Sequence, residues 1–182
     1  VKKELTTEEW KTVIKKAWNA GIPHILFTGG EATLRDDLVE LAKYSDELGQ
    51  VTGLLTDGIA LSDPQLLQDL LNAGLDHLLI MFDSAVEGAW ERMKSILDED
   101  IHTTVHVTIT ADNQKSKIDT INRLAEIGLE NISLSTNDPI LRPFTQSLRD
   151  KCAEMGLNLV WNLPVPYSQF NPIALETQND AE

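Results

Sequence analysis

Two glycines and an acid stand where an apolar run gives way to a helical pattern, in the stretch "FTGGEATLR" at residues 27–35. Adjacent glycines are unfavourable in an ordinary connection, because glycine loses the most backbone freedom on folding. Gly29 and Gly30 would leave their backbone N–H groups open to a ligand, and Glu31 adds a carboxylate suited to an ammonium group. The motif therefore favours an amine-bearing ligand. The alternative is that Glu31 only stabilises the first turn of the following helix through the helix dipole.

One sequence pattern recurs along the chain: an amphipathic helix, then a glycine, then an apolar strand. It indicates the elements that must position the Gly-Gly-Glu motif. Glycine just after a helix occupies the left-handed position that ends many helices, and Thr6 and Glu9 have the spacing of a capping box that starts one. The helix-ending glycines are Gly21, Gly49, Gly74, Gly128 and Gly156. We expect helices at about 7–20, 35–48, 63–73, 86–98, 114–127 and 143–155, and strands at about 23–28, 51–56, 76–82, 102–110, 131–135 and 158–163.

The alternation of helices with short apolar strands predicts an α/β fold with a parallel sheet. Its near-constant period favours a partial (βα)6 TIM-like barrel over the competing architecture, a doubly wound open sheet. The chain opens with a helix, as such a barrel would if its first strand were missing. We expect residues 1–163 to form this truncated barrel, and residues 164–182, with three prolines, to form a linker or tail toward an accessory region.

Polar residues mark the carboxyl ends of the predicted strands, where parallel α/β proteins bind ligands. Within the strand at 102–110, His106 and Thr108 share a polar face, and Ser133 and Ser135 share one on the next strand. An unpaired buried polar group costs about 1–3 kcal/mol, so these faces must find hydrogen-bond partners. A polar ligand or water would meet that need, and so would a self-contained network of side chains. The residues alone leave both open.

Composition excludes several classes of partner. The 182 residues carry a formal net charge of −14, a poor match for nucleic acid or an anionic membrane, which both attract basic surfaces. No run approaches the roughly 18 apolar residues of a membrane span, and no signal peptide is evident, so we expect a cytoplasmic protein. Cys152 is the one cysteine. It excludes an internal disulfide and a cysteine-only metal site, and its helical setting favours a structural role.

Four segments are together similar to the radical S-adenosylmethionine (radical SAM) superfamily, in the expected order over nearly all of residues 4–163. The stretch "HILFTGGEATLR" resembles the strand and Gly-Gly-Glu motif of that family. "LLTDG" at 54–58 resembles its third-strand segment, "LLIMFDS" at 78–84 its fourth, and "VHVTITADN" at 105–113 its fifth.

This resemblance implies a partial barrel that binds S-adenosylmethionine (SAM) across its top. A 4Fe-4S cluster then cleaves SAM to a radical that abstracts a substrate hydrogen, so the cofactor carries the chemistry and the protein orients it. The methionine amino group would be received by the Gly-Gly-Glu motif, the ribose by the ends of the fourth and fifth strands, and the adenine by residues 132–135. The implied cofactor-binding residues are Gly29, Gly30, Glu31, Thr56, Asp83, Ser84, His106, Thr108, Ser133 and Ser135.

The sequence departs from the family pattern in two places. Ala32 stands where proline is usual, and the Cys-x3-Cys-x2-Cys motif that holds the cluster does not occur in the 182 residues. We therefore expect the cluster ligands in a part of the parent protein that precedes residue 1, and we expect this chain alone to be inactive. Surface exposed by a missing strand would favour dimerisation. The substrate, a small molecule or a peptide, is not identified by the residues.

Two other functions remain open at this point. One is a cluster-free barrel that binds SAM or a related nucleoside. The other is an ordinary TIM-barrel lyase or isomerase with a phosphate site at Gly29 and Gly30. Glu31 beside the glycines disfavours the phosphate site, and no evident lysine or acid pair at the strand ends supports such an enzyme.

Overall fold

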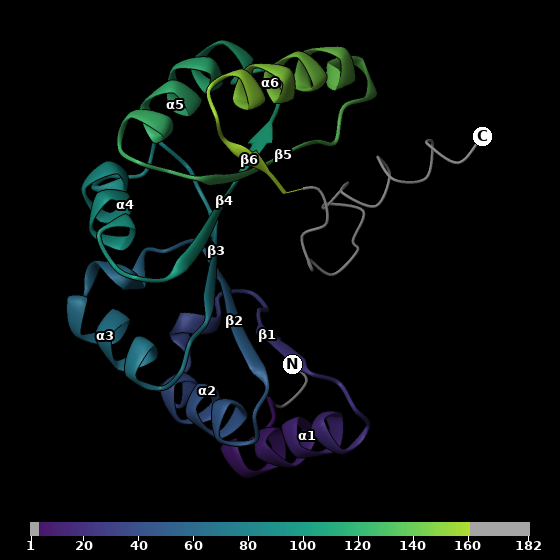
Figure 1. Ribbon diagram of the computed structural model, residues 1–182, viewed down its shortest axis with the longest axis vertical. Coiled ribbons are helices and arrows are strands. Elements are labelled where there is room, and N and C mark those ends of the chain that lie inside the picture. The colour runs from purple at the N-terminus through teal and green to yellow at the C-terminus, as the bar shows by residue number, and fades with distance from the viewer. Residues whose placement is uncertain (1–3, 161–182) are drawn as a thin grey trace. The chain divides into compact units, whose positions relative to one another are not determined.

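The computed structural model describes residues 4–160, in which helices and strands alternate (Figure 1). The strands are β1 (His24–Phe27), β2 (Val51–Thr56), β3 (His77–Met81), β4 (His102–Ile109), β5 (Asn131–Thr136) and β6 (Asn158–Leu159). The helices are α1 (Thr7–Asn19), α2 (Leu38–Glu47), α3 (Pro64–Asn72), α4 (Ala89–Leu97), α5 (Gln114–Glu126) and α6 (Arg142–Glu154). Short 3₁₀ helices follow three of the strands: η1 (Ala32–Leu34), η2 (Ala60–Ser62) and η3 (Pro139–Leu141).

The strands are parallel and follow chain order, β1 to β6. β1 pairs with β2 and β2 with β3, and likewise β4 pairs with β5 and β5 with β6. Parallel neighbours need a crossover connection, which a helix supplies in each case. The predicted α/β fold of alternating helices and parallel strands is therefore confirmed.

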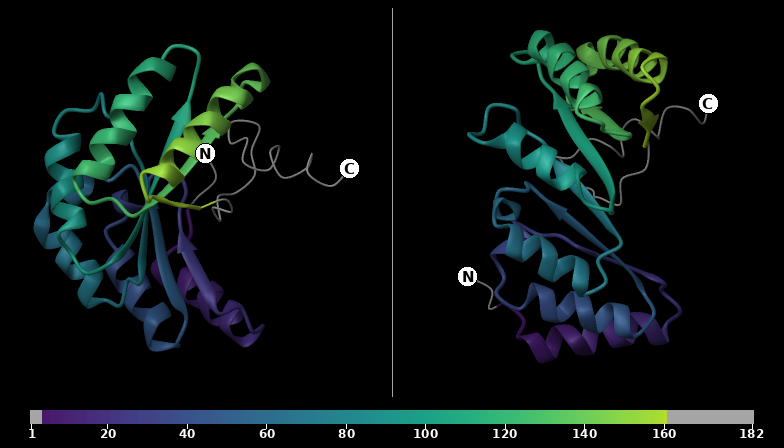
Figure 2. Two further views of the ribbon diagram at one scale, coloured as in Figure 1. Left: turned by 45° about the horizontal axis from the view of Figure 1, so that its top comes forward. Right: turned by 60° about the vertical axis from the view of Figure 1, so that its left-hand side comes forward.

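The chain divides into two compact units, one of residues up to 80 together with 98–102, and one of residues 81–97 together with those from 103 on. Within the first unit α2 packs against β2, and within the second α6 packs against β5 and β6 (Figure 2). Each unit buries apolar side chains of its own. Those of the first unit include Leu38, Leu41, Leu54 and Leu70, and those of the second include Val105, Val107, Ile109, Ile121 and Leu124.

The predicted helix ends are present in the structure. Thr6 and Glu9 form a reciprocal capping box at the start of α1. Asp63 caps α3 by accepting from the N–H of Gln65, with Pro64 in the first turn. All five predicted helix-ending glycines have positive φ angles, which residues with a side chain rarely adopt. Local capping therefore marks the starts of α1 and α3, and a glycine follows the ends of α1, α2, α3, α5 and α6.

Three boundaries differ from the expectation. α2 begins at Leu38 rather than 35 because η1 and a turn occupy the residues between β1 and the helix. α4 begins at Ala89 rather than 86, after a turn in which Gly88 has a φ of 70°. β6 ends at Leu159. The expected end of the barrel at 163 and the tail 164–182 lie outside the described residues.

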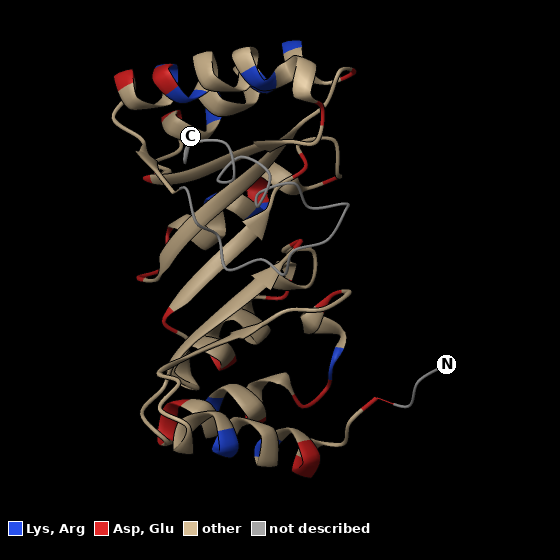
Figure 3. Ribbon diagram, turned by 90° about the vertical axis from the view of Figure 1, so that its right-hand side faces the viewer, with Lys and Arg blue, Asp and Glu red and all other residues tan. Residues whose placement is uncertain are grey.

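Charged residues lie on helices and in loops (Figure 3). Residues 24–27, 51–56, 77–81, 102–109, 131–136 and 158–159, which form the described strands, include no Lys, Arg, Asp or Glu. Burying an unpaired charge is costly, so acidic residues collect where water reaches them. Over residues 4–160, no helix has the length and apolar character needed to cross a membrane.

A polar cluster lies inside the second unit, on neighbouring faces of β4 and β5. His106 is opposite Ser133 in the strand register and is 2% exposed. Its Nδ1 atom lies 3.3 Å from the Ser133 hydroxyl and its Nε2 atom 3.0 Å from that of Ser135. Burial lowers the pKa of His106 to about 4. The imidazole is therefore neutral at physiological pH, with both ring nitrogens partnered by serine.

The neutral His106 predicts acid sensitivity. In the unfolded chain a histidine takes up its proton near pH 6.5, whereas folded His106 does so only near pH 4. Below pH 6.5 the unfolded state binds more protons than the folded state. The contribution of His106 to the free energy of unfolding is therefore intact above pH 6.5 and is lost as pH falls toward 4. The loss amounts to about 3 kcal/mol of the free energy of unfolding, at ~1.4 kcal/mol per pH unit.

Urea unfolding at pH 7 and pH 4.5 measures this loss, with His106→Asn as the variant that cannot titrate. We expect the stability of His106→Asn to fall by less than that of the parent over this range. His24→Asn, at an exposed position, is the matched control and should follow the parent. Equal acid losses in His106→Asn and the parent would contradict the prediction.

Cys152 should be unreactive in the folded protein. The residue is 0% exposed on α6, and burial raises the pKa of its thiol to about 11. Two pKa units correspond to roughly 100-fold less thiolate, which is the reactive form. Alkylation of this single thiol by iodoacetamide at pH 8, followed by mass spectrometry, should be at least about 100-fold slower in buffer than in 8 M urea. Equal rates in the two solvents would show that the thiol is accessible in the native state.

Candidate functional site

The ten predicted cofactor-binding residues fall into two sets, one in each unit. Members of both sets lie on strands or in the loops that follow their carboxyl ends, where ligands of parallel α/β proteins bind. The first set comprises Gly29, Gly30, Glu31 and Thr56, and the second comprises Asp83, Ser84, His106, Thr108, Ser133 and Ser135.

The loop after β1 presents open space at Gly29 and Gly30. Both residues are exposed, and a Cβ atom added to either would meet no atom within 4 Å. Gly29 has a φ of 146°, a conformation that residues with a side chain rarely adopt. The backbone here is therefore accessible to close approach by a ligand.

The Glu31 carboxylate accepts hydrogen bonds from two loops. Its Oε1 atom accepts from the backbone N–H of Thr33 at 3.0 Å and from the hydroxyls of Thr33 and Thr56, each at 2.7 Å. Its Oε2 atom accepts from the backbone N–H of Asp57 at 2.8 Å. Glu31 thereby joins the loop after β1 to the end of β2. A carboxylate has about four acceptor positions shared between its oxygens, so Oε2, with one donor, can accept another.

Glu31 is ionised at neutral pH. Burial raises the pKa of this half-buried carboxyl, but the hydrogen bonds from Thr33, Asp57 and Thr56 outweigh burial and leave the pKa below its ordinary value. The corner formed by Gly29, Gly30 and Glu31 therefore places a negative charge beside exposed glycine backbone, whose N–H groups are potential donors. Such a pair of features is suited to the two opposite charges of an amino acid.

The alternative role for Glu31, in the first turn of the next α-helix, does not match its position. Glu31 caps η1 through the N–H of Thr33, whereas α2 begins only at Leu38. A helix dipole acts mainly within the first turn of its helix, so α2 does not account for this carboxylate.

In the second unit, Asp83 and Ser84 form the turn after β3. Asp83 is exposed, and its Oδ1 atom accepts from the N–H of Ala85 at 3.0 Å. The Ser84 hydroxyl lies 3.2 Å from that of Thr120 on α5. These contacts fix the turn locally and direct the Ser84 hydroxyl toward α5.

Phe82 anchors the same turn. Its backbone N–H donates to the carbonyl of His106 at 3.0 Å. Its ring meets Trp90 edge-on with 5.0 Å between the ring centroids, and the Arg123 guanidinium lies 4.1 Å from the Trp90 centroid. The stack therefore joins the end of β3 to α4 and α5 beside the predicted ribose-binding residues.

Four members of the second set lie together on β4 and β5. His106 forms a hydrogen bond with each serine, and half-buried Thr108 is opposite Ser135 in the register. Each serine hydroxyl has one donor and two acceptor positions, so one hydrogen bond to His106 does not exhaust it.

The predicted site residues do not include two partners of Glu31, Thr33 and Asp57. Thr33 was within the motif, and a hydroxyl two residues after an acid is a usable signal for a local side-chain hydrogen bond. Asp57 acts through its backbone N–H, for which residue type gives no signal.

The residues present do not provide an iron–sulfur centre. Between residues 4 and 160, no group of three or more His, Cys, Asp or Glu side chains could hold a metal ion. The single cysteine of the chain, Cys152, is fully buried on α6. The resemblance to the radical SAM superfamily implies a cluster held by three thiolates, which the single cysteine of this chain cannot supply.

Solved structures share the fold. The chain is similar to Streptococcus suis SuiB bound to the precursor peptide SuiA, with a TM-score of 0.70 and 14% identity, over 94% of this chain and 48% of that one. It is also similar to SuiB bound to S-adenosylmethionine, with a TM-score of 0.65 and 15% identity, over 90% and 46% of the two chains. At these identities the likeness concerns the fold alone.

Curated relatives match in sequence. A PqqA peptide cyclase from Bradyrhizobium diazoefficiens is 42% identical over 91 residues, which cover 50% of this chain and 24% of that protein. One from Rhizobium meliloti is 29% identical over 138 residues, 70% of this chain and 36% of that protein. The chain thus spans about a quarter to a third of the length of these two relatives. Because the family model of the radical SAM superfamily also matches residues 1–102, more than half of the sequence, this chain belongs to that superfamily.

Proposed function

We propose that this chain forms the SAM-binding part of a radical enzyme that modifies a peptide. The corner at Gly29, Gly30 and Glu31 carries the proposal, since it combines exposed, unobstructed glycine backbone with an ionised carboxylate that can accept one more donor. Membership of the superfamily supports SAM as the ligand. The peptide substrate is supported by relatives named as PqqA peptide cyclases and by a similar structure holding a precursor peptide.

The first set of residues would bind the methionine end of SAM. The ammonium group would donate to Oε2 of Glu31, and the N–H groups of Gly29 and Gly30 would face the α-carboxylate. Hydrogen bonds that involve a charged partner contribute about 1.5–3 kcal/mol each, more than neutral ones. Thr56 would act indirectly, by holding the Glu31 carboxylate in place from β2.

The second set would bind the adenosine end. Asp83 is exposed and uses its Oδ1 atom in the local turn, which leaves Oδ2 to accept from a ribose hydroxyl. Thr108, Ser133 and Ser135 offer hydroxyls along β4 and β5. His106 would orient the serines from between them, and Ser84, directed toward Thr120, would stabilise the turn.

A 4Fe-4S cluster, when present in such an enzyme, supplies the electron that cleaves SAM to a hydrogen-abstracting radical. The residues of this chain do not fit that cluster, so its ligands would come from outside the 182 residues. The part of this chain would be to bind SAM and fix its orientation. Cytoplasmic location and dimerisation stay predictions.

The residues at the corner bear on the two alternative functions. A phosphate would meet the Glu31 carboxylate, whose low pKa keeps it negative, so the lyase or isomerase with a phosphate site is disfavoured. A cluster-free module that binds SAM or a nucleoside would use the same residues. It would differ from the proposed radical enzyme only in that the complete protein would lack three cluster-binding cysteines.

Glu31→Gln in the complete protein should weaken SAM binding about 10- to 100-fold, because it removes the charge that the ammonium group requires. Isothermal titration with SAM measures the change. The matched ligand is 5′-methylthioadenosine, which has no amino-acid group and should bind the parent and the variant equally.

Thr56→Val is the matched variant, since it removes one partner of Glu31 and keeps the carboxylate. We expect its affinity for SAM to fall less than that of Glu31→Gln. Unchanged SAM affinity in Glu31→Gln, or an equal loss for both ligands, would assign Glu31 a structural role only.

The 182-residue chain alone should release no 5′-deoxyadenosine from SAM after anaerobic treatment with iron, sulfide and dithionite, because one buried cysteine cannot hold a cluster. Liquid chromatography with mass spectrometry detects this product. The complete enzyme treated in the same way is the positive control. Product from the 182-residue chain above a protein-free blank would overturn the prediction.

A further inference from the structure

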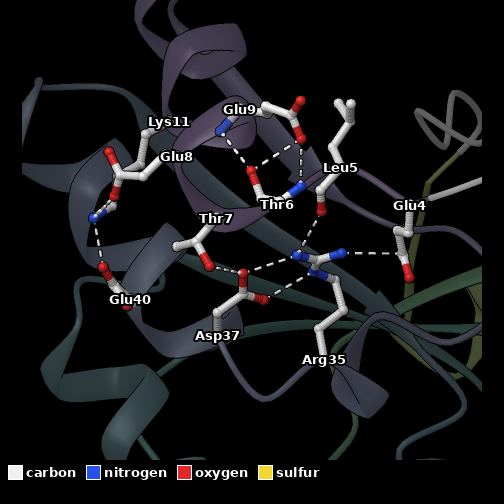
Figure 4. Close-up of polar contacts among 10 residues, drawn as sticks. All are labelled: Glu4, Leu5, Thr6, Thr7, Glu8, Glu9, Lys11, Arg35, Asp37 and Glu40. Carbon is white, nitrogen blue, oxygen red and sulfur yellow. Dashed lines mark hydrogen bonds and ion pairs between the residues drawn. The ribbon is translucent and has the colours of Figure 1, made fainter.

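Arg35 connects the loop after β1 to the segment before α1 (Figure 4). Its Nε and Nη2 atoms donate to the two carboxylate oxygens of Asp37 at 2.9 and 2.8 Å. Its Nη1 atom lies 3.0 Å from the Glu4 carboxylate, and Nη2 also donates to the carbonyl of Leu5 at 3.4 Å. One guanidinium thus contacts both its own loop and residues 30 or more positions earlier.

The segment Glu4–Thr7 is held at several points. The Thr7 hydroxyl donates to Asp37 at 2.6 Å, beside the Arg35 fork. Thr6 is fixed by the capping box with Glu9. Lys11 lies between Glu8 and Glu40 and fastens α1 to α2 independently of Arg35 (Figure 4). Loss of the Arg35 contacts should therefore release Glu4 and Leu5, while the capping box and Lys11 keep α1 in place.

The same Arg35 stands at one end of η1, and Glu31 stands at the other. The backbone N–H of Arg35 donates to the carbonyl of Ala32 at 3.1 Å, and Glu31 caps the turn through Thr33. Ala32 between them is 6% exposed. A three-residue turn buried at one side and bonded at both ends is expected to move as one body, so Glu31 and Arg35 move together.

We propose that Arg35 is a positioning residue that couples the segment Glu4–Thr7 to SAM binding at the corner of Gly29, Gly30 and Glu31. The inference rests on the proposed function, because it requires SAM to contact Glu31. A ligand that immobilises Glu31 restrains η1, and η1 restrains Glu4–Thr7 through the Arg35 fork. By linkage, an ordered segment in turn favours the bound corner.

A planar guanidinium makes these contacts and an ammonium cannot. Bidentate donation to Asp37 with two further acceptors uses the fixed fork of arginine, whereas lysine has a single nitrogen on a flexible stem. Arg35→Lys therefore keeps the charge and removes the geometry. Asp37→Asn removes the other half of the pair and is the second variant.

Hydrogen–deuterium exchange with mass spectrometry tests the coupling in the complete protein, with and without saturating SAM. In the parent, SAM should slow exchange at least threefold both in peptides over 29–37 and in peptides over 4–10. In Arg35→Lys and Asp37→Asn, SAM should still protect 29–37 and should no longer protect 4–10. Arg142→Lys, at an exposed position on α6, is the matched control and should behave as the parent.

The outcomes separate the two hypotheses. SAM protection of 4–10 that persists in both variants, or that is missing in the parent although 29–37 is protected, would overturn the role of Arg35 and leave SAM binding intact. Failure of SAM to protect 29–37 in the parent would overturn the proposed function and this inference with it. A purely structural Arg35 would change exchange over 4–10 equally with and without SAM.

Discussion

The arrangement of the first unit depends on the Glu31 carboxylate. An ionised carboxylate that is half-buried must replace the water it loses, and Glu31 does so with donors from Thr33, Thr56 and Asp57. Thr56 and Asp57 belong to the neighbouring strand β2 and the loop after it, so one side chain fixes two strand ends together. The position of Gly29 and Gly30, and hence any ligand they bind, follows from that attachment.

The same local solution recurs after other strands. Asp57, Asp83 and Asp138 each accept a hydrogen bond from the backbone N–H two residues later, after β2, β3 and β5. Asp and Asn favour such turns because their short side chains reach that N–H. Acidic residues after the carboxyl ends of the strands therefore hold the loops in place. They can bind a ligand only through acceptor positions that the local hydrogen bonds do not use. Glu31 has one such position, on Oε2.

The buried polar side chains of the second unit are satisfied by hydrogen bonds between uncharged groups. Burial keeps His106 neutral, and a neutral imidazole has one donor and one acceptor nitrogen for its two serine neighbours. The sequence allowed two kinds of partner for these polar side chains, a bound ligand or other side chains. The cluster of His106 with the two serines is the second kind. The two are compatible, since the serine hydroxyls retain further hydrogen-bonding capacity.

The sequence by itself determined the order and type of the elements. Apolar periodicity, the Thr6 capping box and the five glycines act over a few residues, so they locate helices and strands without knowledge of the fold. Alternation also predicted that His106 and Ser133 lie on the polar faces of their strands, and the structure pairs these two residues in register. The predicted start of α2, at residue 35, was wrong because η1 has no strong local signal in the sequence.

Only the tertiary structure decided what the polar side chains contact. Thr56 and Asp57 lie 25 and 26 residues from Glu31, and the serines lie 27 and 29 residues from His106. Arg35 likewise reaches Leu5 across 30 residues. Such contacts depend on which strands pair and how closely their loops approach. Residue types predict that a carboxylate or an imidazole needs partners, and the packing of the chain selects them.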